Sequence, residues 1–549
     1  MAKKNVAPSR GKKKVAPSKK TSVKKTVGSP STSELKEIGL FFGAGAEVSY
    51  GLPSGGRFAI EIFRRSSEQQ KKQFKELLES IDRTTYYCRN YLPPDFHKKR
   101  VNVFGKPDFT NLLQSSIEYR RSQVMEFLNN FDEHALAVLR GSGIPQERFD
   151  ELYEEAIGKP FGSSNYGNAI HLNDRLGDEN RLFEAEYFST FLDVLANTDD
   201  SRLLRRCLTS FLQLLVGCCS QKLATDLNEQ IFTEAPDIPI FDDIGGIFQI
   251  EFSQAGLTAL EIILEEQPKD LGESSSLSTI AGELCRATLE RLFEMCLDYQ
   301  ALLDSHFRYV YDPKASWAKF TKISIFLNVV RDYIQEELPS EEDLLSECDG
   351  YYHDLAFLNK YGLAANQIGT VNYNMLAETV CKQHRISPKV YHLNGSVSDF
   401  YDPYLNQIVS LSSPEEEYTQ QNHVIVPMLF TQSGIKPLTS ISMSRRYVEL
   451  YDHFCSCDAI IVIGFGFQSD DGHINGMFRQ LIQEKKKNVY ICKHSPKGYH
   501  ETSARAEYRK KLRLEHDPPN LQFIPVDDDR KTEDGLMWYE ALSQELQSQ

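Results

Sequence analysis

The 549-residue sequence lacks the features that mark a membrane, secreted or zinc-binding protein. No segment approaches the roughly 18 consecutive apolar residues that a membrane span requires, and no apolar stretch follows the N-terminal lysines as it would in a secretory leader. The eleven cysteines are scattered without a repeated spacing, which argues against a disulfide framework or a zinc module. We therefore expect a cytoplasmic protein with reduced thiols, no bound metal and no membrane partner.

Acidic residues are missing from positions 1–33, which hold ten lysines and arginines. The whole chain has a net charge of −15, so the remainder is near −25. Lysine, proline, serine and glycine dominate the first 33 residues, and a segment of that composition buries too little apolar surface to fold. We expect a disordered basic tail over 1–33. It is the only segment suited to contact nucleic acid, because an acidic body repels phosphates.

Strand-like runs are also missing between about residues 70 and 360. Apolar residues there recur at spacings of three and four, as from Leu284 to Leu297, which predicts amphipathic helices. The strands expected elsewhere, several of them continuous apolar runs, cover residues 37–42, 367–372, 390–393, 423–429, 459–464, 488–492 and 521–526. We expect an α/β fold, in which the first strand joins the later ones in a Rossmann-type parallel sheet with a large, mainly helical insertion.

The first strand runs into a glycine-rich segment. Residues 43–47 read Gly-Ala-Gly-Ala-Glu, and residues 51–55 read Gly-Leu-Pro-Ser-Gly before a helix expected over 57–65. Small residues at such a place allow backbone amides to approach a phosphate at a helix N-terminus. Val48 stands where the dinucleotide fingerprint has its third glycine, so a tight structural turn explains the motif equally well.

Polar residues follow two of the later strands. Asn372 and Asn374 come where the strand at 367–372 ends, and the carboxyl ends of parallel strands are where α/β proteins place ligand-contacting side chains. An asparagine that only satisfies loop backbone groups is the alternative. After the next strand, His392 is either a general base or a structural histidine, and Asn394-Gly395 is a strong turn former without any ligand.

A third strand, at 459–464, ends in Gly464-Phe465-Gly466 and is followed by Asp470 and Asp471. The glycines suit a nucleotide-binding edge, where the carboxylates would lie near ribose hydroxyls. The aspartates would otherwise cap the helix that follows.

In this order the motifs resemble the sirtuin-like domain of bacterial antiphage defence proteins, the NAD hydrolases of Thoeris-type and related systems. The matching motifs begin at Gly43, Gly51, Thr370, Leu393 and Ile463. Val424 to Pro427, with Lys436-Pro437 beyond, also looks like the family's connecting strand. The match covers about residues 36–66 and 366–495 and leaves out the helical part. Sirtuin deacylases are similar only in part, because they carry a four-cysteine zinc module that this sequence cannot supply.

The resemblance implies a sirtuin-like NAD-binding domain over 34–66 and 366–549, with an insertion over 67–365 for oligomerisation or sensing. It implies an NAD glycohydrolase that cleaves its substrate NAD to ADP-ribose and nicotinamide, with Asn372 as a catalytic residue that orients water or the ribose. The residues that it implies bind NAD are Gly43, Ala44, Gly45, Ala46, Glu47, Gly51, Leu52, Pro53, Ser54, Asn374, Gly395, Ser396, Gly464, Phe465, Gly466 and Asp470. The amides of residues 44–47 would hold the pyrophosphate.

The sequence departs from the family at the catalytic histidine, whose position is occupied by Asn394. An amide cannot accept a proton near neutral pH, so general-base assistance worth about 10²- to 10⁴-fold would be missing. Three explanations stay open: an inactivating substitution introduced to trap a complex, a naturally weak or silent enzyme, or transfer of the catalytic role to His392.

The leading functional hypothesis is an NAD hydrolase effector of antiphage defence, a homo-oligomer that a partner protein of the defence system or a phage-derived activator switches on. The alternative is a catalytically silent scaffold or sensor subunit that binds NAD or ADP-ribose. A deacylase is the third hypothesis.

Overall fold

The computed structural model describes most of the chain. The described residues are 35–52, 55–172, 180–198, 201–223, 232–234, 257–265, 268–269, 271–272, 274–297, 299–346, 348–411, 423–429, 440–468, 471–495 and 498–548. Of the sequence-based expectations, the basic tail over 1–33, the segment at Lys436-Pro437 and the ligand contacts of Pro53, Ser54 and Asp470 lie outside these residues.

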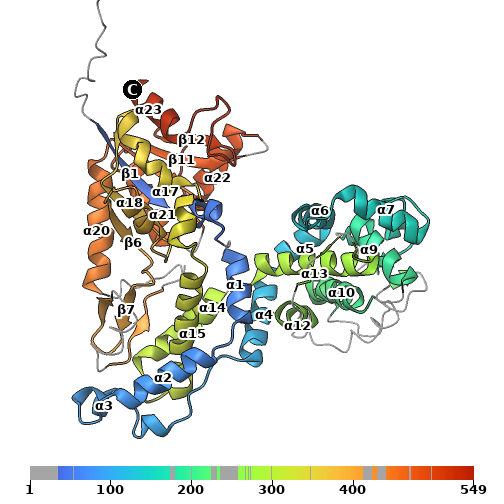
Figure 1. The fold of residues 1–549 in the computed structure, drawn as a ribbon, viewed down its shortest axis with the longest axis horizontal. Helices are drawn as coiled ribbons and strands as arrows, with labels where there is room; N and C mark the ends of the chain where they lie inside the picture. The colour runs from blue at the N-terminus through green and yellow to red at the C-terminus, as the bar shows by residue number, and fades with distance from the viewer. Residues whose placement is uncertain are drawn as a thin grey trace, which may run out of the picture.

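A parallel sheet forms the core of the upper body in Figure 1. Its main strands are β1 (Lys36–Phe42), β5 (Gln367–Thr370), β6 (Lys389–His392), β10 (Ala459–Ile463), β11 (Val489–His494) and β12 (Leu521–Val526). They lie in the order β6-β5-β1-β10-β11-β12 and every pair is parallel, while the short β4 (Leu363–Ala364) pairs with the start of β1. Numbered along the chain, these six strands have the order 3-2-1-4-5-6 of the Rossmann fold. The predicted fold class is confirmed.

Helices cover both faces of the sheet, which explains why the central strand β10 is apolar throughout. All five residues of β10 are buried. Side chains alternate along β1, so Leu40 and Phe42 face one layer and Phe41 faces the other. The first layer contains α17 (Tyr351–Asp354), α18 (Leu376–Gln383) and α23 (Trp538–Ser548). The second contains α20 (Ile441–Ser456), α21 (Gly472–Gln483) and α22 (Glu501–Lys511).

One expected strand does not belong to this sheet. Within 423–429 only β9 (Val426–Pro427) is a strand, and it pairs antiparallel with β7 (Asp399–Asp402), which also pairs with β8 (Gln407–Ser410). The expectation of one parallel sheet was therefore wrong for this segment. Except for Ile425, its apolar residues pack into the helical core, beside α15 (Trp317–Glu336). A short apolar run does not reveal which layer buries it.

The middle of the chain is mainly helical, as expected. A second lobe, at the right of Figure 1, is built around α13 (Leu277–Cys296), and the apolar residues predicted from Leu284 to Leu297 are buried there. Around α13 lie α5 (Arg121–Asn129), α6 (Phe131–Gly141), α7 (Gln146–Ile157), α9 (Glu186–Asn197), α10 (Arg202–Leu223) and α12 (Leu257–Glu265). None of the helices in the described part of the chain combines the length and apolarity that crossing a bilayer would take.

The remaining helices connect this lobe to the sheet and form the lower end of the molecule (Figure 1). They are α1 (Gly55–Arg64), α2 (Glu68–Ser80), α3 (Tyr86–Asn90), α4 (Lys106–Tyr119) and α14 (Tyr299–Phe307). The short α16 (Glu341–Ser346) instead lies beside α18, with Leu344 in the sheet core. Two short strands, β2 (His171–Leu172) and β3 (Phe232–Glu234), form a separate antiparallel pair.

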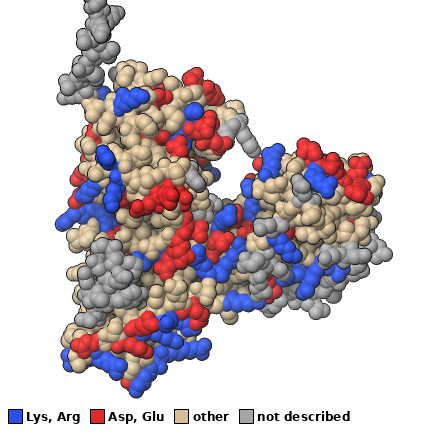
Figure 2. Space-filling model, in the orientation of Figure 1, with Lys and Arg blue, Asp and Glu red and all other residues tan. Residues whose placement is uncertain are grey.

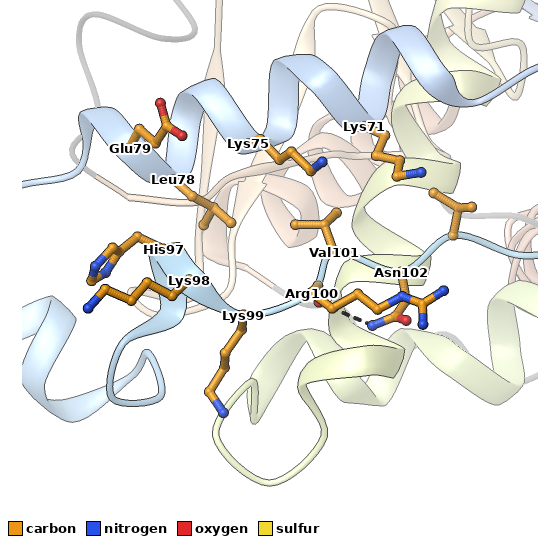
Figure 3. Close-up of a pocket in the computed structure, with 11 residues that line it drawn as sticks. Lys71, Lys75, Leu78, Glu79, His97, Lys98, Lys99, Arg100, Val101 and Asn102 are labelled. Carbon is orange, nitrogen blue, oxygen red and sulfur yellow. Dashed lines mark hydrogen bonds between the residues drawn. The ribbon is translucent and has the colours of Figure 1, made fainter.

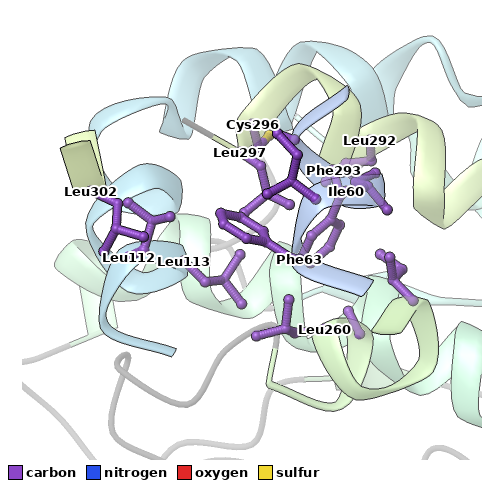
Figure 4. Packing of buried hydrophobic residues seen from close by; sticks show 14 of the residues in the cluster. Ile60, Phe63, Leu112, Leu113, Leu260, Leu292, Phe293, Cys296, Leu297 and Leu302 are labelled. Atoms are coloured by element: carbon purple, nitrogen blue, oxygen red, sulfur yellow. The ribbon is translucent and has the colours of Figure 1, made fainter. Parts of the chain in front are cut away.

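Near the domain borders expected from the sequence, some helices pack in the other core than the one expected. In Figure 4, Ile60 and Phe63 of α1 lie among Leu260 and Phe293, in the helical core rather than against the sheet. Conversely α17, which falls in the expected insertion 67–365, packs Tyr352 on the sheet. By packing, the helical part therefore begins at α1 and ends with α15, because Leu344 of the next helix is also buried in the sheet core.

Candidate functional site

The motifs found in the sequence meet at the carboxyl ends of β1, β5, β6 and β10. From β1 the chain reaches β5 on one side, and it later returns to β10 on the other side of β1. Such a reversal of strand order is the topological switch point at which open α/β sheets bind ligands. The glycine turn, Asn372, the Asn394 turn and Gly464 all follow strands that end at this edge.

The turn after β1 packs directly against the turn after β10. Gly43 N–H donates to Ile463 O at 3.0 Å, and Gly45 N–H donates to Gly464 O at 2.9 Å. Gly464 has a φ of +69°, and a Cβ placed on it would lie 2.1 Å from Ala46 N. No residue with a side chain fits there without moving backbone, so the Gly-x-Gly patterns bring the two turns into contact.

This contact also limits what the first turn offers a ligand. Besides the amide of Gly45, those of Ala46 and Glu47 donate to Gly43 O and Ala44 O at 3.0 and 3.1 Å, within the short helix η1 (Ala44–Ala46) and its caps, just before η2 (Val48–Tyr50). Three of the amides assigned to the pyrophosphate are thus bonded inside the protein. A phosphate would compete with these bonds.

Asn372 and Asn374 contact the first turn, although more than 300 residues separate them from it. The Asn372 amide donates to Gly43 O at 3.2 Å and to the Tyr352 hydroxyl at 3.3 Å. The Asn374 amide donates to Glu47 Oε2 at 2.7 Å, and the Tyr352 hydroxyl donates to Glu47 Oε1 at 2.8 Å. The structure therefore places both asparagines and the glycine turn in one buried hydrogen-bond network.

Glu47 is the ionisable centre of this network and is only 5% exposed. Burial raises its pKa from 4.5 to about 7, since the hydrogen bonds from Asn374, Tyr352 and Asn372 only partly offset the loss of hydration. From the sequence, Glu47 was expected to bind NAD through its backbone amide, not through an ionisable side chain. Its perturbed pKa follows from tertiary burial.

Tyr352 was not predicted as a site residue. It is fully buried in α17, and its own amide donates to the Tyr50 hydroxyl at 3.1 Å while the two rings stack with centroids 5.6 Å apart. Asp354 anchors the same helix through Arg530 and Trp538, both at 2.8 Å. No periodic pattern marks a four-residue helix, so its only sequence signal is the cluster of aromatic and polar residues at 351–354.

His392 lies at the end of β6 and is bonded through both ring nitrogens. Nδ1 is 2.8 Å from Asn372 O, and Nε2 is 2.8 Å from Glu378 Oε1. The carbonyl and an ionised Glu378 carboxylate both accept hydrogen bonds, so the protonated ring donates from both nitrogens. Burial lowers its pKa, but Glu378 and the carbonyl outweigh burial and hold the pKa above the usual value. In this protonated form His392 has no lone pair with which to accept a proton.

The turn at Asn394 is held by buried polar bonds. Asn394 is 1% exposed, and a Cβ on Gly395, which has a φ of +84°, would lie 1.9 Å from Met428 O. The Ser396 hydroxyl donates to Asp399 Oδ2 at 2.9 Å. Burial alone would raise the pKa of Asp399, but a bidentate pair with Arg446, at 2.7 and 2.8 Å, holds it below the usual value. This network fixes the turn without a ligand.

The other expected ligand residues have visible packing roles. Phe465 lies against Phe41 with ring centroids 5.2 Å apart. Gly51 ends η2 with a φ of +78°, and Leu52 packs on the sheet core. Within the described ranges, no three His, Cys, Asp or Glu side chains come together as metal ligands would.

Comparisons with known proteins give the following result. No family model and no curated protein matches the chain. Among solved structures it is similar to Sir2Af2 bound to a myristoylated histone peptide, with 14% identity and a TM-score of 0.22 over 35% of this chain and 76% of that chain. It is also similar to Sir2 bound to an acetylated peptide, with 10% identity and a TM-score of 0.22 over 44% of this chain and 81% of that one. The fold class itself follows from the strand order, and the chain is an α/β protein with a Rossmann-type sheet.

Proposed function

We propose that this chain binds NAD at the switch point of its sheet and hydrolyses the nicotinamide–ribose bond. The observation that carries the proposal is the meeting of Asn372 with the glycine turn, through the 3.2 Å bond to Gly43 O, in a sheet of Rossmann strand order. The motif resemblance to sirtuin-like NAD hydrolases supports the choice of ligand and reaction.

In the proposed reaction, water adds to the anomeric carbon of the ribose as nicotinamide leaves as a neutral molecule. The water loses one proton, which requires a base. Asn394 is an amide, and His392 donates from both of its nitrogens. Glu47, with a pKa of about 7 and a network shared with Asn372, is the group that we propose accepts the proton.

Nicotinamide release from NAD tests this directly. Activity should rise with pH through about 7, because the base must be ionised. Asn372→Ala and Glu47→Gln should each lose at least about 100-fold. Matched controls are Asn366→Ala and Glu37→Gln, which lie at the opposite ends of the same two strands and bond each other at 2.8 Å. If neither the wild type nor Asn394→His releases nicotinamide at any pH, the hydrolase proposal fails.

A silent NAD- or ADP-ribose-binding scaffold is the second candidate, favoured by Asn394 and by the double engagement of His392. Calorimetry separates the two candidates. If the chain is a scaffold, the wild type and Asn394→His should bind NAD or ADP-ribose equally well, and neither protein should hydrolyse NAD.

The biological setting belongs to the same proposal: NAD depletion in antiphage defence by a homo-oligomer that a partner protein or a phage-derived activator triggers. Phage infection of bacteria that express the chain tests this, with Asn372→Ala as the matched inactive variant. Equal phage yields from the two strains would contradict the role in defence.

A further inference from the structure

A pocket of about 560 Å³ lies far from the candidate NAD site, at the lower end of the molecule. It is formed by α2 on one side and by residues 97–103, which follow α3, on the other (Figure 3). Its volume falls within the range of about 300–1,000 Å³ that small-molecule sites occupy. The sequence motifs and the proposed hydrolysis give it no role.

Basic side chains dominate the lining. Lys71 and Lys75 extend from α2, and Lys98, Lys99 and Arg100 come from the opposite segment, with Glu79 as the acidic lining residue (Figure 3). Figure 2 shows basic side chains at this lower end of the molecule, although the chain as a whole has a net charge of −15. The pocket is therefore positively charged, whereas the protein as a whole is negatively charged.

Most of these charges are not neutralised by the protein. Lys71 pairs with Glu68 at 2.8 Å, outside the pocket lining. Within the part of the chain that the structure describes, Lys75, Lys98, Lys99 and Arg100 have no ion-pair partner. Like charges held together repel, so the arrangement destabilises the free protein and is relieved by a bound anion.

Buried residues hold the pocket lining in place. Leu78 and Val101 are 2% and 5% exposed. The segment that carries Arg100 is tied to α15, because Trp317 Nε1 donates to Arg100 O and Asn102 N–H donates to Thr321 Oγ1, both at 3.0 Å. The buried Nδ1 of His97, another lining residue, has no hydrogen-bond partner among the described atoms. A ligand acceptor or donor at this nitrogen would satisfy it.

We propose that this pocket binds a polyphosphate group, carried by a nucleotide or free as inorganic polyphosphate. Clustered lysines and an arginine neutralise several phosphates at once. The pocket lies outside the sheet edge, so the proposal does not depend on NAD hydrolysis.

Calorimetric titration of the full chain with ATP and, separately, with inorganic tripolyphosphate tests the proposal. The pocket variant is Lys75→Ala with Arg100→Ala. Its matched control is Lys72→Ala with Arg83→Ala, two exposed cations nearby that do not line the pocket. We expect both probes to bind the wild type and the control, and the pocket variant to bind at least about tenfold more weakly.

The basic tail is the same in all three proteins, so the difference between variants isolates the pocket. Tighter binding of ATP than of tripolyphosphate identifies a nucleotide, and equal binding identifies inorganic polyphosphate. Identical titrations of the pocket variant and the wild type would overturn the proposal. Single-stranded DNA that binds far more tightly than ATP and loses its affinity in the same variant would also overturn it, in favour of a nucleic-acid surface.

Discussion

Glu47→Gln should change how the stability of the sheet depends on pH. In the folded protein the pKa of Glu47 is about 7, against 4.5 for the unconstrained side chain. The folded state therefore holds the proton more tightly than the unfolded state. Stability is greatest when both states are protonated and falls as pH rises from below 4.5 through about 7, because ionisation is easier in the unfolded chain. Glutamine cannot ionise, so the stability of the variant should not fall in this way as pH rises.

The size of the effect follows from the shift. Each pKa unit corresponds to about 1.4 kcal/mol, and between about pH 5 and about pH 8 the wild type should lose about 2.5 kcal/mol through Glu47. The substitution also leaves the Asn374 amide facing a second amide instead of Oε2. That cost applies at every pH, so the comparison between the two pH values isolates the ionisation.

Tryptophan fluorescence provides the assay. The chain has two tryptophans, and Trp317→Phe leaves Trp538, which is fully buried on the sheet, as the reporter. Urea unfolding at the two pH values, in this background with and without Glu47→Gln, gives the difference in the free energy of unfolding.

A pH dependence that is the same with and without Glu47→Gln would refute the reasoning. It would mean that the hydrogen bonds from Tyr352 and Asn374 keep the carboxylate ionised despite its burial. Glu37→Gln, which removes a partly exposed carboxylate from β1, controls for the removal of one charge.

Three further predictions concern the neighbouring turns. Glu378→Gln removes the partner that raises the pKa of His392. The pair stabilises the folded protein at pH values below 6.5, the usual pKa of histidine, and this stabilisation is lost as pH rises through the higher pKa of the folded state. Thermal unfolding should therefore show a cost of about 1.5–3 kcal/mol at about pH 5.5 and a smaller one at about pH 9, and equal costs would contradict the ion pair. Arg446→Ala leaves Asp399 buried without its cation and should cost about 2–3 kcal/mol in urea unfolding, whereas an unchanged midpoint would show that the pair is immaterial. Gly464→Ala should cost on the order of 3–5 kcal/mol or prevent folding, since its φ is +69°; a stable, soluble variant on gel filtration would contradict the close contact of the turns.

The parallel sheet could be predicted because its strands are buried on both faces. β10 and β12 are apolar runs with clear ends, and their expected limits agree with the structure to within one residue. Residues 423–429 have the same local character but are buried by helices rather than by the sheet. The local sequence indicates that a segment is buried, but the tertiary contacts determine in which core it is buried.

The meeting of the motifs at one edge could likewise be predicted, because parallel strands align their carboxyl ends. What could not be predicted is how polar side chains pair there. His392 was a candidate base until its contacts with Asn372 O and Glu378 appeared. Tyr352 lies in a helix too short to have a period, and the shifted pKa of Glu47 depends on residues distant in sequence.

The two central strands β1 and β5 are neighbours in space, and Thr370 Oγ1 contacts Phe42 O across 328 positions of chain. Closing an unstructured loop of that length would cost about 5 kcal/mol in chain entropy. The insertion avoids this cost once folded, because it leaves and re-enters the sheet at one point, where Tyr50 and His353 are 3.0 Å apart. Assembly of the sheet is thus linked to the integrity of the helices. Heating, proteolysis or a partner that opens the helical part would free the ends of β1 and β5 and dismantle the central strand pair.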